Sequence, residues 1–314
     1  MKFNLKYNNG YNLGLSSGVF WAINAALLSF ILSQEEIPNF GLYIPLGVIL
    51  VAFIHDSFSA ITLFIFKIKL NNLKKLKIRK HYYLSLSGFL AGPVGLTCYL
   101  LAIKYLGVAV ATSTVAIYPV IIAMVLSFFF GEKIKKYTIL SILLTVIGCI
   151  GVNLFSANTI FVEKIFMGIF FSVICVFTWS FECIVVDRLS NDDSLDSSVM
   201  LFVRQLSSAL LYLIIISFII DFDYSVFSMF NYSLVSWILF ASLFATLSYL
   251  TWYSAIDKLG APIATLLNVT YSFWGVCISY LFLNQYVDIP MFISMCLILS
   301  GVSILLVNKN KGLE

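Results

Sequence analysis

Charged residues are scarce in this sequence of 314 residues. Asp, Glu, Lys and Arg make up 11 % of it, hydrophobic residues make up 61 %, and the mean hydropathy is +1.00. A water-soluble domain carries about 25 % charged residues, and a globule of this size still needs a polar surface. The composition therefore excludes a soluble fold and indicates a protein that is solvated by lipid.

The residues that build enzymatic and metal centres are also few. The chain has two histidines, His55 and His81, and it contains neither a His-Glu-x-x-His motif nor a P-loop. Its six cysteines form no Cys-x-x-Cys pair, so we expect buried free thiols. We predict no metal, no cofactor and no enzymatic activity. A membrane enzyme acting on lipid-linked substrates remains a distant alternative, because His55, Asp56 and Arg204 could meet at one interface.

Long apolar runs dominate what is present. A transmembrane helix needs about 20 mostly apolar residues. Ten runs satisfy this length, with boundaries near 13–33, 41–66, 82–103, 108–130, 137–155, 164–187, 198–220, 233–256, 262–283 and 289–307. The sequence predicts an all-α membrane protein of ten transmembrane helices.

The Lys and Arg residues are distributed unevenly among the loops. With the N-terminus in the cytoplasm, sixteen of the 19 lie on inner segments, and only Lys104 and Lys164 lie on outer ones. The positive-inside rule then predicts that both termini are cytoplasmic. The basic run 67–80 sets topology and touches lipid head groups, so we predict no nucleic-acid partner.

The second half of the chain repeats the first. A shift of 153 positions places Leu106-Gly107 on Leu259-Gly260 and Tyr118 on Tyr271. Each half, 1–156 and 157–314, holds five spans, and an odd number makes the second half enter the membrane in the opposite direction. This five-plus-five inverted repeat is typical of secondary transporters, whose solute site lies at the repeat interface.

The ends of the half-repeats carry a family pattern. It runs Tyr99-x-x-Ala102-Ile103-x-x-Leu106-Gly107, then Tyr118-Pro119, then Phe130-Gly131-Glu132-Lys133. The chain resembles the EamA-type members of the drug/metabolite transporter superfamily, although Gln285 replaces the second Glu of the pattern. The resemblance implies alternating-access transport of a small molecule through a single transmembrane domain.

A narrower resemblance concerns the interior of the spans. Four segments are similar to the Lic-type bacterial choline permeases: Phe53-Ile54-His55-Asp56, Gly92-Pro93-x-Gly95, Trp179-Ser180-x-Glu182-Cys183 and Arg204-Gln205. This resemblance implies choline import across the bacterial inner membrane. An exporter of amino acids or hydrophobic drugs is the alternative, and a homodimer is left open.

Ionisable groups within spans are costly and therefore candidates for function. There are four: His55, Asp56, Glu182 and Arg204. Arg204 keeps its charge and needs an anion. We expect Asp56 and Arg204, with His55 beside them, to form a structural or coupling group, which leaves Glu182 as a free counter-ion for the substrate.

Aromatic residues suggest the rest of a binding site. Trp179 shares a helical face with Glu182. A looser repeat match aligns Trp21 with Trp179 and Asn24 with Glu182. Aromatic faces attract alkylammonium groups, so we predict a box for a quaternary or primary amine. The further candidate rings are Tyr99, Tyr118, Tyr249, Tyr253, Tyr271 and Trp274, with Trp252 excluded because its neighbour Tyr253 was expected to face the cavity.

The charge count can be tested directly. A cysteine introduced at Asp223 should react with a membrane-impermeant thiol reagent in whole cells, whereas a cysteine at Lys75 should react only after permeabilisation. The reverse pattern of labelling would overturn the assigned orientation.

Overall fold

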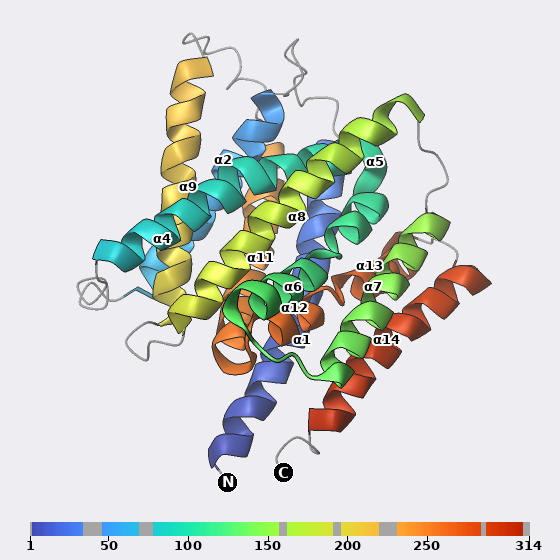
Figure 1. Ribbon diagram of the computed structural model, residues 1–314. Helices are drawn as coiled ribbons and strands as arrows, with labels where there is room; N and C mark the ends of the chain where they lie inside the picture. The colour runs from blue at the N-terminus through green and yellow to red at the C-terminus, as the bar shows by residue number, and fades with distance from the viewer. Residues whose placement is uncertain are drawn as a thin grey trace.

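A computed structural model describes residues 2–33, 46–68, 78–156, 162–190, 196–219, 231–283 and 287–309. Every regular element in these ranges is helical. The helices are α1 (Lys2–Leu32), α2 (Leu46–Phe66), α4 (Ile78–Phe89), η1 (Leu90–Leu96), α5 (Thr97–Val115), α6 (Tyr118–Phe130), α7 (Lys136–Ser156), α8 (Val162–Ser190), α9 (Ser197–Ile219), α11 (Tyr232–Leu259), α12 (Ala261–Asn268), α13 (Tyr271–Leu283) and α14 (Ile289–Lys309). They form one bundle (Figure 1).

The predicted membrane fold is confirmed. Within the described residues, eight helical segments are long and apolar enough to cross a membrane, and two shorter apolar helices lie at 118–130 and 136–152. Together they account for the ten predicted spans. The start of the second span, predicted near residue 41, lies outside the described residues.

Spans four and nine are each broken in two. The fourth consists of the end of α5 followed by α6, with a turn at residues 116–117, as Pro119 predicts, because a proline within a span removes a backbone donor. The ninth consists of α12 followed by α13, with a turn at 269–270 that the sequence analysis did not predict. There the Thr270 hydroxyl donates to the Leu267 carbonyl at 2.6 Å.

The third span contains a π-helical segment, η1, around Pro93. Proline removes a backbone donor within a helix and leaves carbonyl groups to be satisfied by other partners. Trp179 donates its indole N–H to the Ala91 carbonyl at 3.1 Å, and Tyr212 donates its hydroxyl to the Gly92 carbonyl at 2.9 Å. The irregular backbone therefore binds side chains of α8 and α9.

The packing follows the internal repeat. Two pairs of repeat-equivalent helices pack against each other, α2 with α9 and α7 with α14. Other contacts match in the same way. α1 packs on α11, and α8, the equivalent of α1 in the second half, packs on α4, η1 and α5. Gly107 and Gly260, equivalent under the shift of 153, both have φ 79° and ψ 159°. This pattern is that of an inverted repeat, and the exact division at residue 156 remains a prediction.

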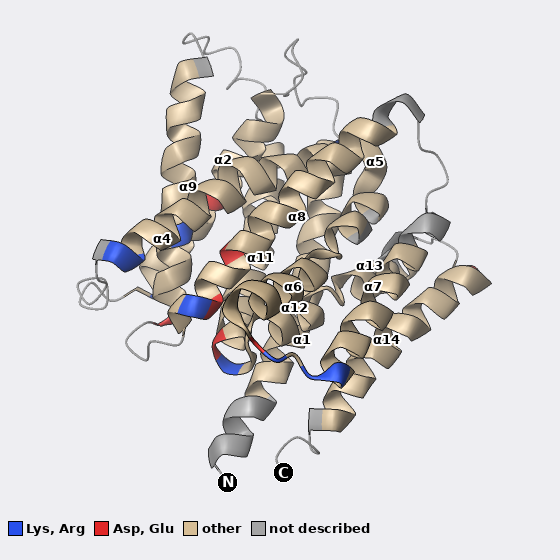
Figure 2. Cartoon of the chain, in the orientation of Figure 1, with Lys and Arg blue, Asp and Glu red and all other residues tan. Residues whose placement is uncertain are grey.

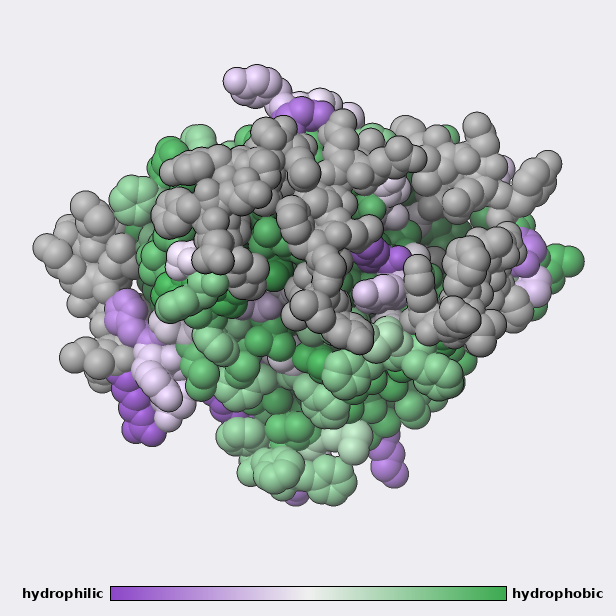
Figure 3. Space-filling view, turned by 90° about the horizontal axis from the view of Figure 1, so that it is seen from above, coloured by the Kyte–Doolittle hydropathy of each residue, from purple (hydrophilic) through white to green (hydrophobic). Residues whose placement is uncertain are grey.

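The outer surface is apolar. Seen from above, hydrophobic residues form much of the visible rim (Figure 3), and large side chains such as Phe129, Phe218 and Phe292 are exposed. Such a rim requires lipid around it. The expectation of buried thiols is wrong for two of the six free cysteines, because Cys277 is half-buried and Cys296 is exposed on this apolar surface.

The charged residues occupy one part of the bundle. α1 begins and α14 ends at the same end of the molecule (Figure 1), as an even number of spans requires. Most of the charged residues lie in the half that contains this end (Figure 2). The asymmetry matches the loop charges counted in the sequence.

Gly88 of the third span allows close helix packing, and Gly275 of α13 provides a control for a test of it. A Cβ added at Gly88 would meet the backbone oxygen of Arg204, whereas one added at Gly275 would have nothing within 4 Å. Gly88→Ala should cost about 1–3 kcal/mol of stability through overpacking. Gly275→Ala should be neutral or gain up to about 1 kcal/mol. Thermal unfolding in detergent measures both, and equal melting temperatures would contradict the packing.

Candidate functional site

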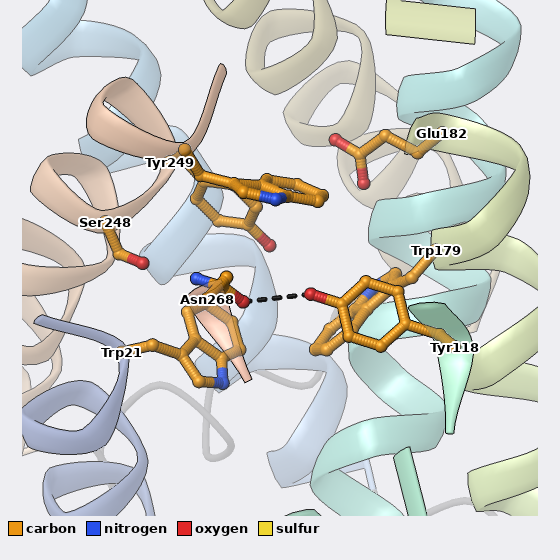
Figure 4. A pocket seen from close by; sticks show the side chains of 8 residues that line it. Trp21, Tyr118, Trp179, Glu182, Ser248, Tyr249 and Asn268 are labelled. Carbon is orange, nitrogen blue, oxygen red and sulfur yellow. Dashed lines mark hydrogen bonds between the residues drawn. The ribbon is translucent and has the colours of Figure 1, made fainter. Parts of the chain in front are cut away.

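A pocket lies at the centre of the bundle where five helices meet. Its lining residues come from α1 (Trp21), α6 (Tyr118), α8 (Trp179 and Glu182), α11 (Ser248, Tyr249 and Trp252) and α12 (Asn268). Figure 4 shows them arranged around a common space. Aromatic and polar side chains that converge on one space within a bundle are typical of a small-molecule site.

Aromatic rings form the walls of the pocket. The ring centroids of Trp21 lie 5.4 Å from Trp179 and 5.5 Å from Tyr249, both edge to face. Tyr118 and Trp252 are 6.4 Å apart across the pocket. These separations lie in the range of favourable aromatic pairs, so the rings brace one another while they line the space.

Local sequence explains how Trp179 is held. Its indole N–H is bound by the Ala91 carbonyl that the π-helical segment offers. Gly95 lies against the ring, and an added Cβ there would come within 2.9 Å of it. The Gly92-Pro93-x-Gly95 segment therefore supplies both the acceptor and the room for this tryptophan.

Amide and hydroxyl groups form the opposite side of the pocket. Tyr118 donates its hydroxyl to the Asn268 side-chain oxygen at 2.9 Å (Figure 4). The Asn268 amide donates to Ser17 at 2.9 Å, and Ser248 donates to the Ser17 carbonyl at 2.8 Å. These bonds join α1, α6, α11 and α12, the helices on either side of the pocket.

Arg204 is completely buried beside the pocket and binds two carboxylates. Its Nε lies 2.8 Å from Glu182 Oε1, and its Nη1 lies 3.3 Å from Asp56 Oδ2. The predicted contact between Asp56 and Arg204 is therefore present. The prediction that Glu182 would be left unpaired is wrong, because the guanidinium fork has donors enough to reach both acids.

The two oxygens of Glu182 differ in their surroundings. Oε1 accepts from Arg204 and also from the Tyr253 hydroxyl at 2.5 Å. Oε2 is buried and has no hydrogen-bond partner among the described residues. Since a buried carboxylate oxygen without a donor is costly, Oε2 is the group in the pocket that most needs a ligand.

His55 extends the Arg204 cluster toward the first half of the repeat. Arg204 offers one positive charge to Asp56 and Glu182. His55 contacts Asp56 Oδ1 at 3.1 Å through Nδ1 and the Asn24 side-chain oxygen at 3.3 Å through Nε2. The buried cluster therefore joins α1, α2, α8 and α9 next to the pocket.

The cluster repeats the inverted symmetry at the level of side chains. Asn24 is the repeat equivalent of Glu182, and His55 is the equivalent of Arg204. Each forms the matching contact, Asn24 with His55 and Glu182 with Arg204. One half of the molecule thus holds an ion pair where the other holds an amide and an imidazole, so the anionic site belongs to the second half.

The structure brings half of the predicted binding residues to the pocket. Five line it: Glu182, Trp179, Trp21, Tyr118 and Tyr249. The other five, Asn24, Tyr99, Tyr253, Tyr271 and Trp274, do not.

These five residues have other contacts, which explains the correction. Tyr99 packs against Trp21 and Trp179 with its ring tilted to both, Tyr271 donates to the Thr112 carbonyl, and Trp274 packs on Phe273. Asn24 binds His55 and Tyr253 binds Glu182. They surround the pocket lining without entering it.

Three lining residues were missed: Trp252, Ser248 and Asn268. Trp252 was set aside because Tyr253 is adjacent to it, but both are buried. α11 packs against α1, α2, α9 and α12, so more than one of its faces is interior. A polar amide within an apolar span was the available signal for Asn268.

Comparison with known proteins agrees with this geometry. The model of the EamA-like transporter family matches the chain twice, at residues 8–154 and 166–307. The chain belongs to the EamA-like transporter family. The two matches correspond to the two halves of the repeat, and they confirm the family resemblance seen in the sequence.

Individual relatives cover the chain almost completely. Protein LicB of Haemophilus influenzae is 31 % identical over 308 residues, which are 96 % of this chain and 99 % of LicB. This agrees with the Lic-type resemblance. One solved crystal structure superposes with a TM-score of 0.72 at 14 % identity, covering 97 % of this chain and 98 % of the other, and shows the shared fold.

The charge cluster predicts a pattern of stability. Arg204→Ala would leave two buried carboxylates without their cation, which costs about 3–5 kcal/mol, so folded yield should fall sharply. Adding Asp56→Asn should recover part of the yield, and adding Glu182→Gln as well should recover more. Fluorescence-detected gel filtration measures the yield.

The matched control for this series is Arg79→Ala, which removes the same charge from an exposed position. It should leave the yield unchanged. A triple neutral variant that folds no better than Arg204→Ala would show that the carboxylates do not depend on this arginine.

Proposed function

We propose that this EamA-like protein is a secondary transporter that carries a small organic cation, with choline as the first candidate, into the bacterial cell. The observation that supports the proposal is the Glu182 carboxylate, whose Oε2 is buried and unpartnered in a pocket walled by Trp21, Trp179 and Trp252. An ammonium group in the pocket would meet both a negative charge and aromatic faces.

The energetics favour a cation in this pocket. A cation that leaves water loses its hydration, and an isolated charge in a low-dielectric interior is unfavourable. A desolvated cation–π contact returns about 2 kcal/mol, and the Glu182 carboxylate supplies further attraction. A fully methylated ammonium needs no hydrogen-bond acceptor, so aromatic faces suit it better than polar side chains do.

The role proposed for Arg204 is to hold Glu182 rather than to bind substrate. Arg204 and Tyr253 both occupy Oε1, and this fixes the carboxylate with its other oxygen at the pocket. The guanidinium carbon of Arg204 lies 4.9 Å from the centre of the Tyr249 ring. Asp56, Arg204 and His55 thus form a supporting group behind the binding site.

The polar side of the pocket favours a second candidate, a zwitterionic amine. The Asn268 amide has a second N–H that could bind a substrate carboxylate, and the Ser248 oxygen could accept from a substrate hydroxyl. An amino-acid or drug exporter has less need of a carboxylate beside Trp179, so the effect of removing the Glu182 charge separates these alternatives.

Location and orientation are part of the proposal. The apolar rim indicates a lipid environment, and the concentration of Lys and Arg at one end supports cytoplasmic termini in a bacterial inner membrane. The Lic-type resemblance and the relative named LicB support import of choline. Lipid is the expected surrounding partner, and a homodimer remains a prediction.

Binding of choline to purified protein tests the counter-ion. Glu182→Gln keeps the shape of the side chain and removes its charge, so the affinity for choline should fall at least tenfold, about 1.4 kcal/mol. Trp179→Phe should weaken binding less than Trp179→Ala, because a smaller ring still offers a face. Isothermal titration calorimetry with choline, betaine and tetramethylammonium measures these effects.

Asp288→Asn is the matched control. Asp288 accepts a bond from the Met291 N–H at the start of α14, and asparagine also caps helices, so choline affinity should stay at the wild-type value. Wild-type affinity in Glu182→Gln would refute the counter-ion role. If the wild type binds none of the three compounds, the proposed substrate class is refuted.

A further inference from the structure

A second group of charges lies apart from the pocket, where three segments meet. The Arg188 guanidinium forms an ion pair with Glu132, which follows α6, and lies 4.2 Å from the centre of the Phe130 ring. The preceding residue, Asp187, accepts a hydrogen bond from the Ala261 backbone N–H at 2.7 Å. These contacts connect the end of α6, the end of α8 and the beginning of α12.

The same three helices carry pocket residues. Along α8, Asp187 lies five residues beyond Glu182, about 8 Å at 1.5 Å per residue. Along α12, Ala261 lies seven residues before Asn268, about 10 Å. Tyr118 begins α6, and Glu132 follows the end of that helix. Asp187 and Ala261 therefore lie within about two helical turns of pocket residues on their own helices, whereas Glu132 lies at the opposite end of α6 from Tyr118.

The opposite half of the repeat does not carry this group. The shift that relates Trp21 to Trp179 places Ser29 and Phe30 on Asp187 and Arg188. Phe30 packs on the Trp237 ring at 5.4 Å between centroids instead of forming an ion pair. The position equivalent to Glu132 is Gln285, which lies outside the described residues. The sequence therefore places charge at these positions in one half only.

We propose that Glu132, Arg188, Asp187 and the N-terminus of α12 form an ionic latch that closes the cytoplasmic side of the pocket. Opening toward the cytoplasm separates α12 and α6 from the end of α8 and breaks both contacts. The inference goes beyond the proposed substrate and rests on the protein being a transporter with cytoplasmic termini. It assigns an ionic closure to one side of the membrane and an aromatic contact to the repeat-equivalent position on the other.

The strength of the contacts suits a latch. The side chains of Arg188 and Glu132 are 31 % and 40 % exposed, so solvent screens their attraction, and such pairs are weaker than buried ones. Arg204, by contrast, is fully buried and holds its partners permanently. The latch can therefore break in each transport cycle while the Arg204 cluster stays intact.

Hydrogen exchange of the purified full-length protein tests the latch. Arg188→Ala and Glu132→Gln should each speed amide exchange in α12 and in the last turns of α8 at least fivefold, without affecting α7 and α14. Arg188→Lys, which keeps the charge, should restore part of the protection. Acrylamide should also quench tryptophan fluorescence more strongly in Arg188→Ala, because three of the five tryptophans line the pocket.

Lys133→Ala is the control, since it removes a charge from the residue next to Glu132 and should leave both readings at the wild-type level. Unchanged exchange in both latch variants, or acceleration spread evenly over all helices, would overturn the proposal. If Arg188→Ala fails to fold, Glu132→Gln decides the outcome, because it alters only the charge of a partly exposed side chain.

Discussion

The structure depends on one buried arginine. Arg204 is fully enclosed between α2, α8 and α11, and its charge is met by Asp56 and Glu182. In a bilayer interior such a group is tolerated only with its partners in place. The bonds fix the relative positions of α2, α8 and α9, which come from both halves of the repeat. They also orient the carboxylate that we propose as the counter-ion of the substrate.

The arrangement occurs once because the two halves of the inverted repeat carry different residues at equivalent positions. The first half offers Asn24 and His55 at the positions of Glu182 and Arg204. Both pairs make the same contact, so the fold is preserved, but only the second pair is ionic. The latch at Arg188 shows the same difference between halves. Under the proposals made above, similar backbones with different charges would allow one molecule to bind a single cation and to close its two sides with different contacts.

The sequence predicted the architecture well because lipid imposes a simple rule. Spans must be apolar and about 20 residues long, and loop charges are counted without knowledge of contacts. The prediction was poorer for the site. Two spans are broken at turns near Pro119 and Thr270, and only the first of these turns has a proline beside it that marks the break in the sequence. Trp252 was excluded by an argument about helix faces that holds only for a helix with a single interior side.

The sequence by itself determined that this is a ten-span, five-plus-five transporter of the EamA type, because hydropathy, charge and repeat register are written along the chain. It also identified Glu182, Trp179, Trp21, Asp56 and Arg204 as unusual within apolar spans. Only the tertiary structure decided which oxygen of Glu182 is free and which aromatic rings face the pocket. Those properties depend on distances between helices far apart in the chain, and helical periodicity does not contain them.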